Sequence, residues 1–243
     1  MIPLVLLPGY MLDDALWDAM LPHLPPDMPL HFASLAEGDS IAAMAHAVLA
    51  RCPPQFNLLG FSMGGYVARE MVRLAPQRVA ALTLVASSSR ADPPLMAEQR
   101  GKAARATPLG PFRGLGRAAI AQSLHPDNVG NAALLAQVRA MGERLGREVF
   151  VRQSLIVRSA DTAQLGGIAC PTLVVHGADD QLRSLDEAQE LAQGIPGARL
   201  QVIAGAGHLV PLEQPVSLAQ ALAAILAEPL AEPLAEPLAG RWP

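Results

Sequence analysis

The stretch that decides the fold is Gly60-Phe61-Ser62-Met63-Gly64-Gly65, a Gly-x-Ser-x-Gly turn between two different elements. Before it, Phe56–Leu59 is a short apolar run that suits a buried parallel strand, and after it Tyr66–Leu74 carries apolar residues at helical spacing. Glycine permits the sharp turn and close packing that raise a serine above the carboxyl end of a strand. This context favours Ser62 as a nucleophile; the alternative is a glycine-rich turn with an incidental serine.

Short apolar runs alternate with helical patterns on both sides of this turn, which predicts a parallel sheet with helices on its faces. The strand-like runs are Pro3–Leu7, Leu30–Ser34, Phe56–Gly60, Val79–Ala86, Thr172–His176 and Leu200–Ile203. The helix-like segments are Leu12–Leu21, Ser40–Arg51, Gly64–Ala75, Asp186–Gln193 and Gln214–Ala227.

Two segments depart from this alternation. Residues 89–168 are rich in Ala, Arg, Gly and Leu without strand-like runs, and predict a helical cap inserted between core segments 1–88 and 169–226. Residues 227–243 form a tail that begins with three copies of Ala-Glu-Pro-Leu over residues 227–238, where a proline at every fourth position removes helix hydrogen bonds. We expect a frayed or extended tail there, either a functionally neutral duplication or an adhesion peptide.

Composition narrows the class of protein. The 243 residues suit one domain with an insertion, and despite 51% hydrophobic residues no apolar stretch reaches the ~20 residues of a membrane span. The N-terminus lacks a basic region, an apolar region and a cleavage site, so we expect a cytoplasmic protein that neither enters a membrane nor is secreted. Cys52 and Cys170 each precede a proline and are interpreted as structural thiols in a reducing compartment.

Charge is unevenly distributed along the chain. The net charge of −4 offers no basic footprint for nucleic acid. Between Arg90 and Arg158, however, eleven basic residues face five acidic ones, a balance of +6, while the rest of the chain carries −10. Either these arginines attract an anionic substrate or an acidic carrier domain, or they are solvated and paired with the acidic body.

A serine hydroxyl needs a base and a group that orients the base before it becomes a useful nucleophile. The segment His176–Gln181 places a turn glycine and two carboxylates, Asp179 and Asp180, just past a strand. Further on, Gly205–Pro211 holds His208 on a glycine-flanked loop before a helix. Serine, then aspartate, then histidine is the chain order of one known catalytic triad.

Four motifs in this order resemble the α/β-hydrolase fold superfamily, in particular its cap-bearing serine hydrolases of carboxylesterase or lactonase type. They are Leu6–Tyr10, Gly60–Gly65, Pro171–Asp180 and Gly205–Pro215. The resemblance implies an α/β fold with a mostly parallel sheet of about six strands, beginning at the third strand of the family, flanked by helices and carrying a helical cap. It also selects Asp180 as the acid, with Asp179 stabilising the turn.

The resemblance implies a role for each motif residue. His208 takes the proton of Ser62, Asp180 orients the imidazole, and the acyl group passes transiently to Ser62. The backbone N–H groups of Tyr10 and Met63 would form the oxyanion hole. The family more often has histidine where this chain has proline before Gly9, which leaves the donor at Tyr10 but removes a side chain able to brace the loop.

Other residues receive weaker assignments. Candidate substrate-pocket residues are Met96, Leu109, Phe112, Leu115, Leu124 and His176, although each also suits simple packing. The remaining histidines, His23, His31, His46 and His125, lack metal-ligand spacing, and no dinucleotide or phosphate-binding glycine motif occurs. We therefore expect neither a metal nor a cofactor.

The expected function is hydrolysis of a small or medium acyl ester through a Ser-His-Asp triad, with a small-molecule ester as substrate. The same three residues also suit a thioesterase, an enol-lactonase, a carbon–carbon bond hydrolase, an acyltransferase or a cofactor-free haloperoxidase. A dehalogenase or epoxide hydrolase is disfavoured because those relatives carry a carboxylate in place of Ser62. A ligand receptor or signalling regulator on the same fold is the alternative from a different class.

Overall fold

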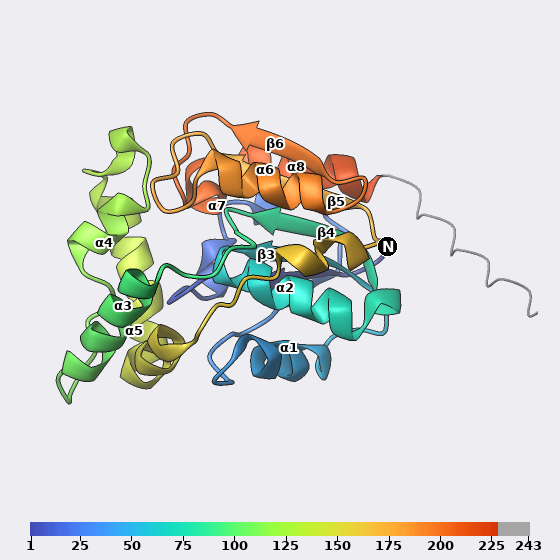
Figure 1. The fold of residues 1–243 in the computed structure, drawn as a ribbon. Helices are drawn as coiled ribbons and strands as arrows, with labels where there is room; N and C mark the ends of the chain where they lie inside the picture. Colours follow the sequence, from blue (N-terminus) through green and yellow to red (C-terminus); the bar gives the residue numbers. More distant parts are fainter. Residues whose placement is uncertain (228–243) are drawn as a thin grey trace, which may run out of the picture.

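A parallel sheet in the strand order β2-β1-β3-β4-β5-β6 forms the centre of the computed structural model, which describes residues 1–227 (Figure 1). The strands are β1 (Leu4–Leu7), β2 (Leu30–Phe32), β3 (Phe56–Phe61), β4 (Val79–Val85), β5 (Thr172–Gly177) and β6 (Arg199–Ile203). Each neighbouring pair is parallel. The predicted fold class and the expected six strands are confirmed.

Alternating side chains of the central strands divide the core into two layers. Leu4 and Leu6 of β1 pack in one cluster with α8 (Pro215–Leu226), whereas Val5 and Leu7 pack in the other. The second cluster is completed by α1 (Ile41–Leu49), α2 (Met63–Leu74) and α6 (Leu185–Gly194). Because successive strand residues point to opposite faces, a strand covered on both sides is apolar throughout.

The N-terminal connection differs from the sequence prediction. Instead of one helix over Leu12–Leu21, the chain makes two 3-10 turns, η1 (Asp14–Leu16) and η2 (Leu21–His23). Asp13 caps the first turn by accepting a hydrogen bond from the N–H of Ala15, and proline lies within the second. The aspartate cap starts a helical turn, whereas the proline has no N–H to donate and disfavours helical backbone in the residue before it, so a continuous helix is interrupted there. Trp17 is fully buried between the two turns.

Residues 89–155 form helices that lie together beyond the carboxyl ends of the strands, and we call this segment the cap (Figure 1). It contains α3 (Pro94–Ala106), α4 (Arg117–Gln122), η4 (Pro126–Asn128) and α5 (Ala132–Leu155). The last turn of the predicted insertion, η5 (Thr162–Gly167), packs instead on the core beside α6, where Leu165 belongs to the second core cluster. Helix α5 is kinked at Gly146, whose φ of 79° is left-handed. The last core helices are α7 (Val210–Glu213) and α8; a further 3-10 turn, η3 (Pro76–Arg78), precedes β4.

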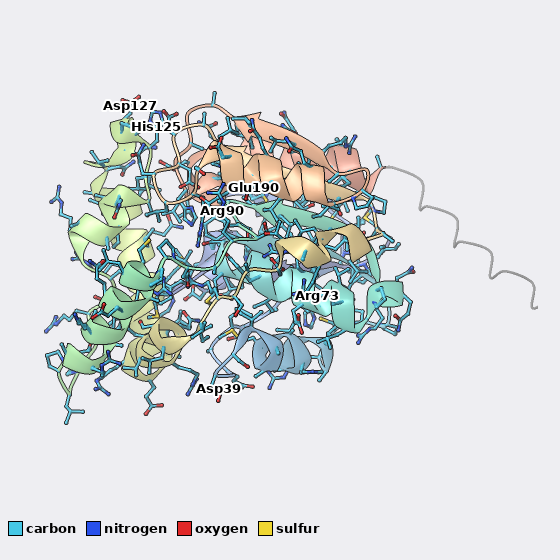
Figure 2. The ribbon with its side chains drawn as sticks, viewed as in Figure 1. Asp39, Arg73, Arg90, His125, Asp127 and Glu190 are labelled. Carbon is cyan, nitrogen blue, oxygen red and sulfur yellow. The ribbon has the colours of Figure 1, made fainter. Side chains whose placement is uncertain are left out.

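Ion pairs join the cap to the core. Figure 2 shows Arg90, where the chain enters the cap, beside Glu190 of α6, and their closest atoms are 2.5 Å apart. On the opposite side, Arg144 of α5 pairs with Asp13 at 2.7 Å. Part of the basic excess of the cap is therefore paired with the acidic core.

Two further sequence predictions concern the C-terminal tail and membrane-spanning helices. The predicted tail of Ala-Glu-Pro-Leu repeats lies outside the described residues apart from Ala227. Within residues 1–227, no helix combines the length and the apolar character that crossing a bilayer would require.

Candidate active site

Ser62 lies on a strained turn between β3 and α2. Its φ of 50° and ψ of −111° are unfavourable for a residue with a side chain. The turn is held on both sides, since the N–H of Ser62 donates to the carbonyl of Val85 and its carbonyl accepts from the hydroxyl of Ser87, at 2.8 and 3.0 Å. A Cβ at Gly64 would lie 2.5 Å from the carbonyl oxygen of Pro8, so only glycine permits this approach.

The structure brings Ser62, His208 and Asp180 into one chain of hydrogen bonds. Nε2 of His208 lies 2.9 Å from Oγ of Ser62, and Nδ1 of His208 lies 2.8 Å from Oδ2 of Asp180. The histidine ring also packs against the ring of Phe61, with centroids 5.2 Å apart. Ser62, His208 and Asp180 thus have the spacing that proton transfer from a serine hydroxyl to a histidine requires.

The side chain of Asp180 is fully buried and held in its ionised form. Burial raises its pKa, but the charge and hydrogen bond of His208 outweigh this effect, together with the backbone N–H groups of Arg183 and Leu182, so that the net pKa is lowered. Those two N–H groups donate to Oδ1 at 3.0 and 2.8 Å, leaving Oδ2 for the histidine. Asp179 points elsewhere and lies 3.2 Å from Nε2 of His125 in the cap.

Glu213 of α7 positions the histidine loop and was missed by the sequence analysis. One carboxylate oxygen accepts a hydrogen bond from the N–H of Gly207, the neighbour of His208, at 2.8 Å. The other accepts from the N–H of His125 and the side chain of Asn128, at 2.7 and 2.9 Å. A single carboxylate therefore joins the loop that carries His208 to the cap. Glu213 lies within the Gly205–Pro215 motif, and this place in the sequence was the signal that could have identified it.

The candidate oxyanion donors lie on two different elements. Met63 begins α2, where the first N–H groups have no partner within the helix. Tyr10 follows β1, and its side chain hydroxyl lies 2.7 Å from the hydroxyl of Ser154 in α5. The sequence indicated that proline in place of histidine removes one side chain able to brace this loop, and the cap helix α5 supplies another contact.

Gln153 is the main part of that brace. Its side chain oxygen accepts a hydrogen bond from the N–H of Met11 at 2.8 Å, and its side chain amide donates to the carbonyl of Leu35 at 3.0 Å. Gln153 is only 1% exposed, and Met11 has a left-handed φ of 56°. The loop next to Tyr10 is thus held by a buried amide 142 residues further along the chain.

A cavity of about 430 Å³ opens onto Ser62 and His208 between the core and the cap. Two of the predicted pocket residues, Met96 of α3 and Leu115, line it. Further apolar lining comes from Tyr10, Leu12, Phe61, Ile120, Val138 and Leu209. The arginines Arg100, Arg158 and Arg183 also line it, which the sequence did not indicate.

The other four predicted pocket residues do not line this cavity. Leu109 lies in a turn after α3 and is 88% exposed, whereas the ring of Phe112 packs on Phe150 at 4.8 Å between centroids. Leu124 is buried in the core cluster. His176 is buried within β5, and burial lowers its pKa. Apolar character alone did not distinguish side chains facing the cavity from those packing the cap.

No group of three or more His, Cys, Asp or Glu side chains within residues 1–227 is arranged to hold a metal ion. Cys52 and Cys170 are both free thiols.

Comparison with known proteins places these features in context. The family described as alpha/beta hydrolase fold matches residues 37–215. The pimeloyl-acyl-carrier-protein methyl ester esterase of Aromatoleum aromaticum is 31% identical, the alignment covering 89% of this chain and 94% of that protein. The esterase of the same name from Photobacterium profundum is 29% identical and covers 89% and 91%.

Solved structures show the same likeness. A thermophilic esterase from Thermogutta terrifontis, in a malate-bound structure, is 28% identical with a TM-score of 0.81 and covers 93% of this chain and 89% of that chain. The enol-lactonase from Burkholderia xenovorans also has a TM-score of 0.81, over 94% of this chain and 92% of that chain. At 21% identity, the comparison with the lactonase shows only that the two chains share a fold.

Proposed function

Because the chain belongs to the α/β hydrolase fold family, we propose that it hydrolyses carboxylic esters through Ser62, His208 and Asp180. The observation that carries this proposal is the unbroken hydrogen-bond chain from Oγ of Ser62 to Asp180, beside a cavity whose lining is mostly apolar. The names of the relatives, which are esterases, support the same reaction class.

The geometry supports a two-step mechanism. His208 accepts the proton of Ser62 at Nε2 while the serine oxygen attacks the ester carbonyl, and Asp180 stabilises the resulting imidazolium. The N–H groups of Tyr10 and Met63 donate to the tetrahedral oxyanion. Collapse breaks the ester bond, and His208 returns the proton to the leaving alcohol. Water, deprotonated by His208, then attacks the acyl-enzyme and releases the carboxylic acid and Ser62.

For the substrate, we propose a methyl ester on an acyl chain held by an acidic carrier protein, as the names of the relatives indicate. Several cap arginines pair with carboxylates, but four others are exposed and have no ionic partner among residues 1–227, which leaves them available to acidic groups. These four are Arg105, Arg113, Arg117 and Arg139.

The first experiment compares oxoesters and thioesters of varied acyl length and leaving group in the wild type, Ser62→Ala and the surface control Ser34→Ala. We expect Ser62→Ala to lower kcat by about 10⁴-fold or more and the control to change nothing. Hydrolysis that survives Ser62→Ala would refute the proposed triad. Slow turnover with tight ligand retention would instead favour a receptor, and preference for thioesters a thioesterase.

The carrier is tested separately. Charge reversal of Arg113 and Arg117 to glutamate should raise KM for a carrier-bound methyl ester by about 10-fold or more, without affecting a free methyl ester. Equal KM values for the variant and the wild type on the carrier-bound ester would exclude this surface as the docking site.

A further inference from the structure

A cluster of three arginines forms one wall of the cavity that holds Ser62 and His208. Arg100 comes from α3, Arg158 from the segment after α5, and Arg183 from the turn that follows β5. Their side chains are only 18, 7 and 14% exposed, respectively. They are therefore distinct from the exposed arginines on the outside of the cap.

The positive charge of this cluster exceeds the negative charge around it. All three guanidinium groups converge on Asp92, at 2.5 Å from Arg100, 3.3 Å from Arg158 and 3.8 Å from Arg183. The only other carboxylate paired with the cluster among residues 1–227 is Glu187, which lies 3.1 Å from Arg183. Three positive charges thus face two negative charges in a largely desolvated wall.

The cluster also contains unused hydrogen-bond donors. The Nε atoms of Arg100 and Arg158 are buried and have no hydrogen-bond partner within the described part of the chain. Burial lowers the pKa of Arg158, and the charges of Arg100 and Arg183 lower it further, whereas Asp92 and Tyr66 raise it; the net pKa is lowered. Burying cations without full compensation costs free energy, so this arrangement calls for an additional anion.

Arg69, a buried arginine of helix α2, shows how a fully paired arginine differs from this cluster. Arg69 of α2 is 0% exposed, and its Nε and Nη2 atoms donate to Asp161 at 2.7 and 3.0 Å. Nη2 also donates to the carbonyl of Ser88 at 2.7 Å. This structural arginine is fully partnered and does not line the cavity at Ser62. Within residues 1–227, the buried guanidinium nitrogens that lack a hydrogen-bond partner are therefore those of arginines that line the cavity.

We propose that Arg100, Arg158 and Arg183 form a subsite for an anionic group of the substrate, beside the ester that Ser62 attacks. The subsite adjoins the triad, because the backbone N–H of Arg183 donates to Asp180. Guanidinium groups bind carboxylates and phosphates through paired hydrogen bonds. The inference rests on the proposed function and narrows it: preferred substrates carry a carboxylate, or the phosphate of a carrier arm, away from the scissile ester.

Activity provides the first test. Monomethyl glutarate, adipate and pimelate are compared with their methyl ester carboxamides, which have the same shape without the charge. We expect kcat/KM to favour the carboxylate by about 10- to 100-fold at one chain length, and we expect the ratio of the carboxylate value to the carboxamide value to fall towards one in Arg100→Gln. Lys102→Gln is the matched control, because it removes a positive charge from the same helix at an exposed position.

Binding provides a test that does not need turnover. Calorimetry should show a dicarboxylate binding to Ser62→Ala, with affinity about 10- to 100-fold lower when Arg100→Gln is added. A thioester of phosphopantetheine compared with pantetheine, both carrying the same methyl ester, then tells phosphate from carboxylate as the recognised anion.

The outcomes separate the two proposals. Ser62-dependent hydrolysis with no preference for any charged substrate, and no dicarboxylate binding, would overturn the anionic subsite and leave the esterase intact. Absence of Ser62-dependent hydrolysis for every ester would overturn the esterase, whereas Arg100-dependent dicarboxylate binding would still support the subsite.

Discussion

Replacement of Gln153 by leucine should damage both stability and catalysis, because this buried side chain ties the cap to the loop that carries Tyr10. Leucine has a similar volume but leaves the N–H of Met11 and the carbonyl of Leu35 without partners. Each of these two unpaired backbone groups costs about 1–3 kcal/mol. The leucine side chain avoids the cost of burying the polar amide of Gln153, and this offsets part of the loss. We therefore expect the free energy of unfolding to fall by about 2–4 kcal/mol.

Catalysis should suffer as well, because Met11 follows Tyr10, the proposed oxyanion donor. Outright removal of one such donor typically costs about 10²- to 10³-fold in kcat. Displacement of the loop should cost less, about 10- to 100-fold, and should appear in kcat more than in KM, since the donor acts on the transition state.

Urea unfolding and steady-state hydrolysis of a neutral methyl ester measure the two effects, at a temperature where both proteins are folded. Tyr10→Phe is the matched control: it removes the contact with the hydroxyl of Ser154 but keeps Gln153, and should cost only about 1 kcal/mol. A Gln153→Leu variant that loses stability but keeps its kcat would refute the positioning role. Unchanged stability would refute the cost assigned to the stranded backbone groups.

Three further experiments, two with substitutions and one with thiol labelling, test other parts of the molecule. Gly64→Ala places a Cβ 2.5 Å from a backbone oxygen and should cost about 3 kcal/mol in urea unfolding and abolish ester turnover, whereas Gly166→Ala, with no atom within 4 Å, should do neither. Asp161→Ala leaves buried Arg69 without its carboxylate and should cost about 3–5 kcal/mol, part of which Arg69→Met restores; no recovery in the double variant would contradict this account. Burial raises the pKa of Cys52 to about 11, so at pH 8 only about one thiol in a thousand is ionised. Alkylation by iodoacetamide should therefore be slow until the protein is denatured, and rapid labelling of the native protein would oppose this.

The sequence was sufficient for the framework because the relevant signals are local. The turn around Ser62 could be predicted because all its parts are adjacent in the sequence. One short stretch contains the strand, the glycines that permit the turn and the helix. The alternation of apolar runs with helix-like segments predicted the parallel sheet and the helices on its faces, because this signal is also local. The order of Ser62, Asp180 and His208 followed from motifs that each occupy a few consecutive residues, and the structure places the three side chains in hydrogen-bond contact.

Tertiary structure decided what surrounds that framework. Composition did not tell Met96, which faces the cavity, from Leu109, which faces solvent, because both are apolar residues of the same cap segment. Nor did it reveal that Gln153 braces a loop 142 residues away, or that arginines from three separate segments share one carboxylate at the cavity wall. Such contacts depend on how distant elements pack, so local propensity and periodicity carry no record of them. Ser62 could be proposed as the nucleophile from its own neighbourhood, whereas the cavity wall emerges only when the cap lies against the core.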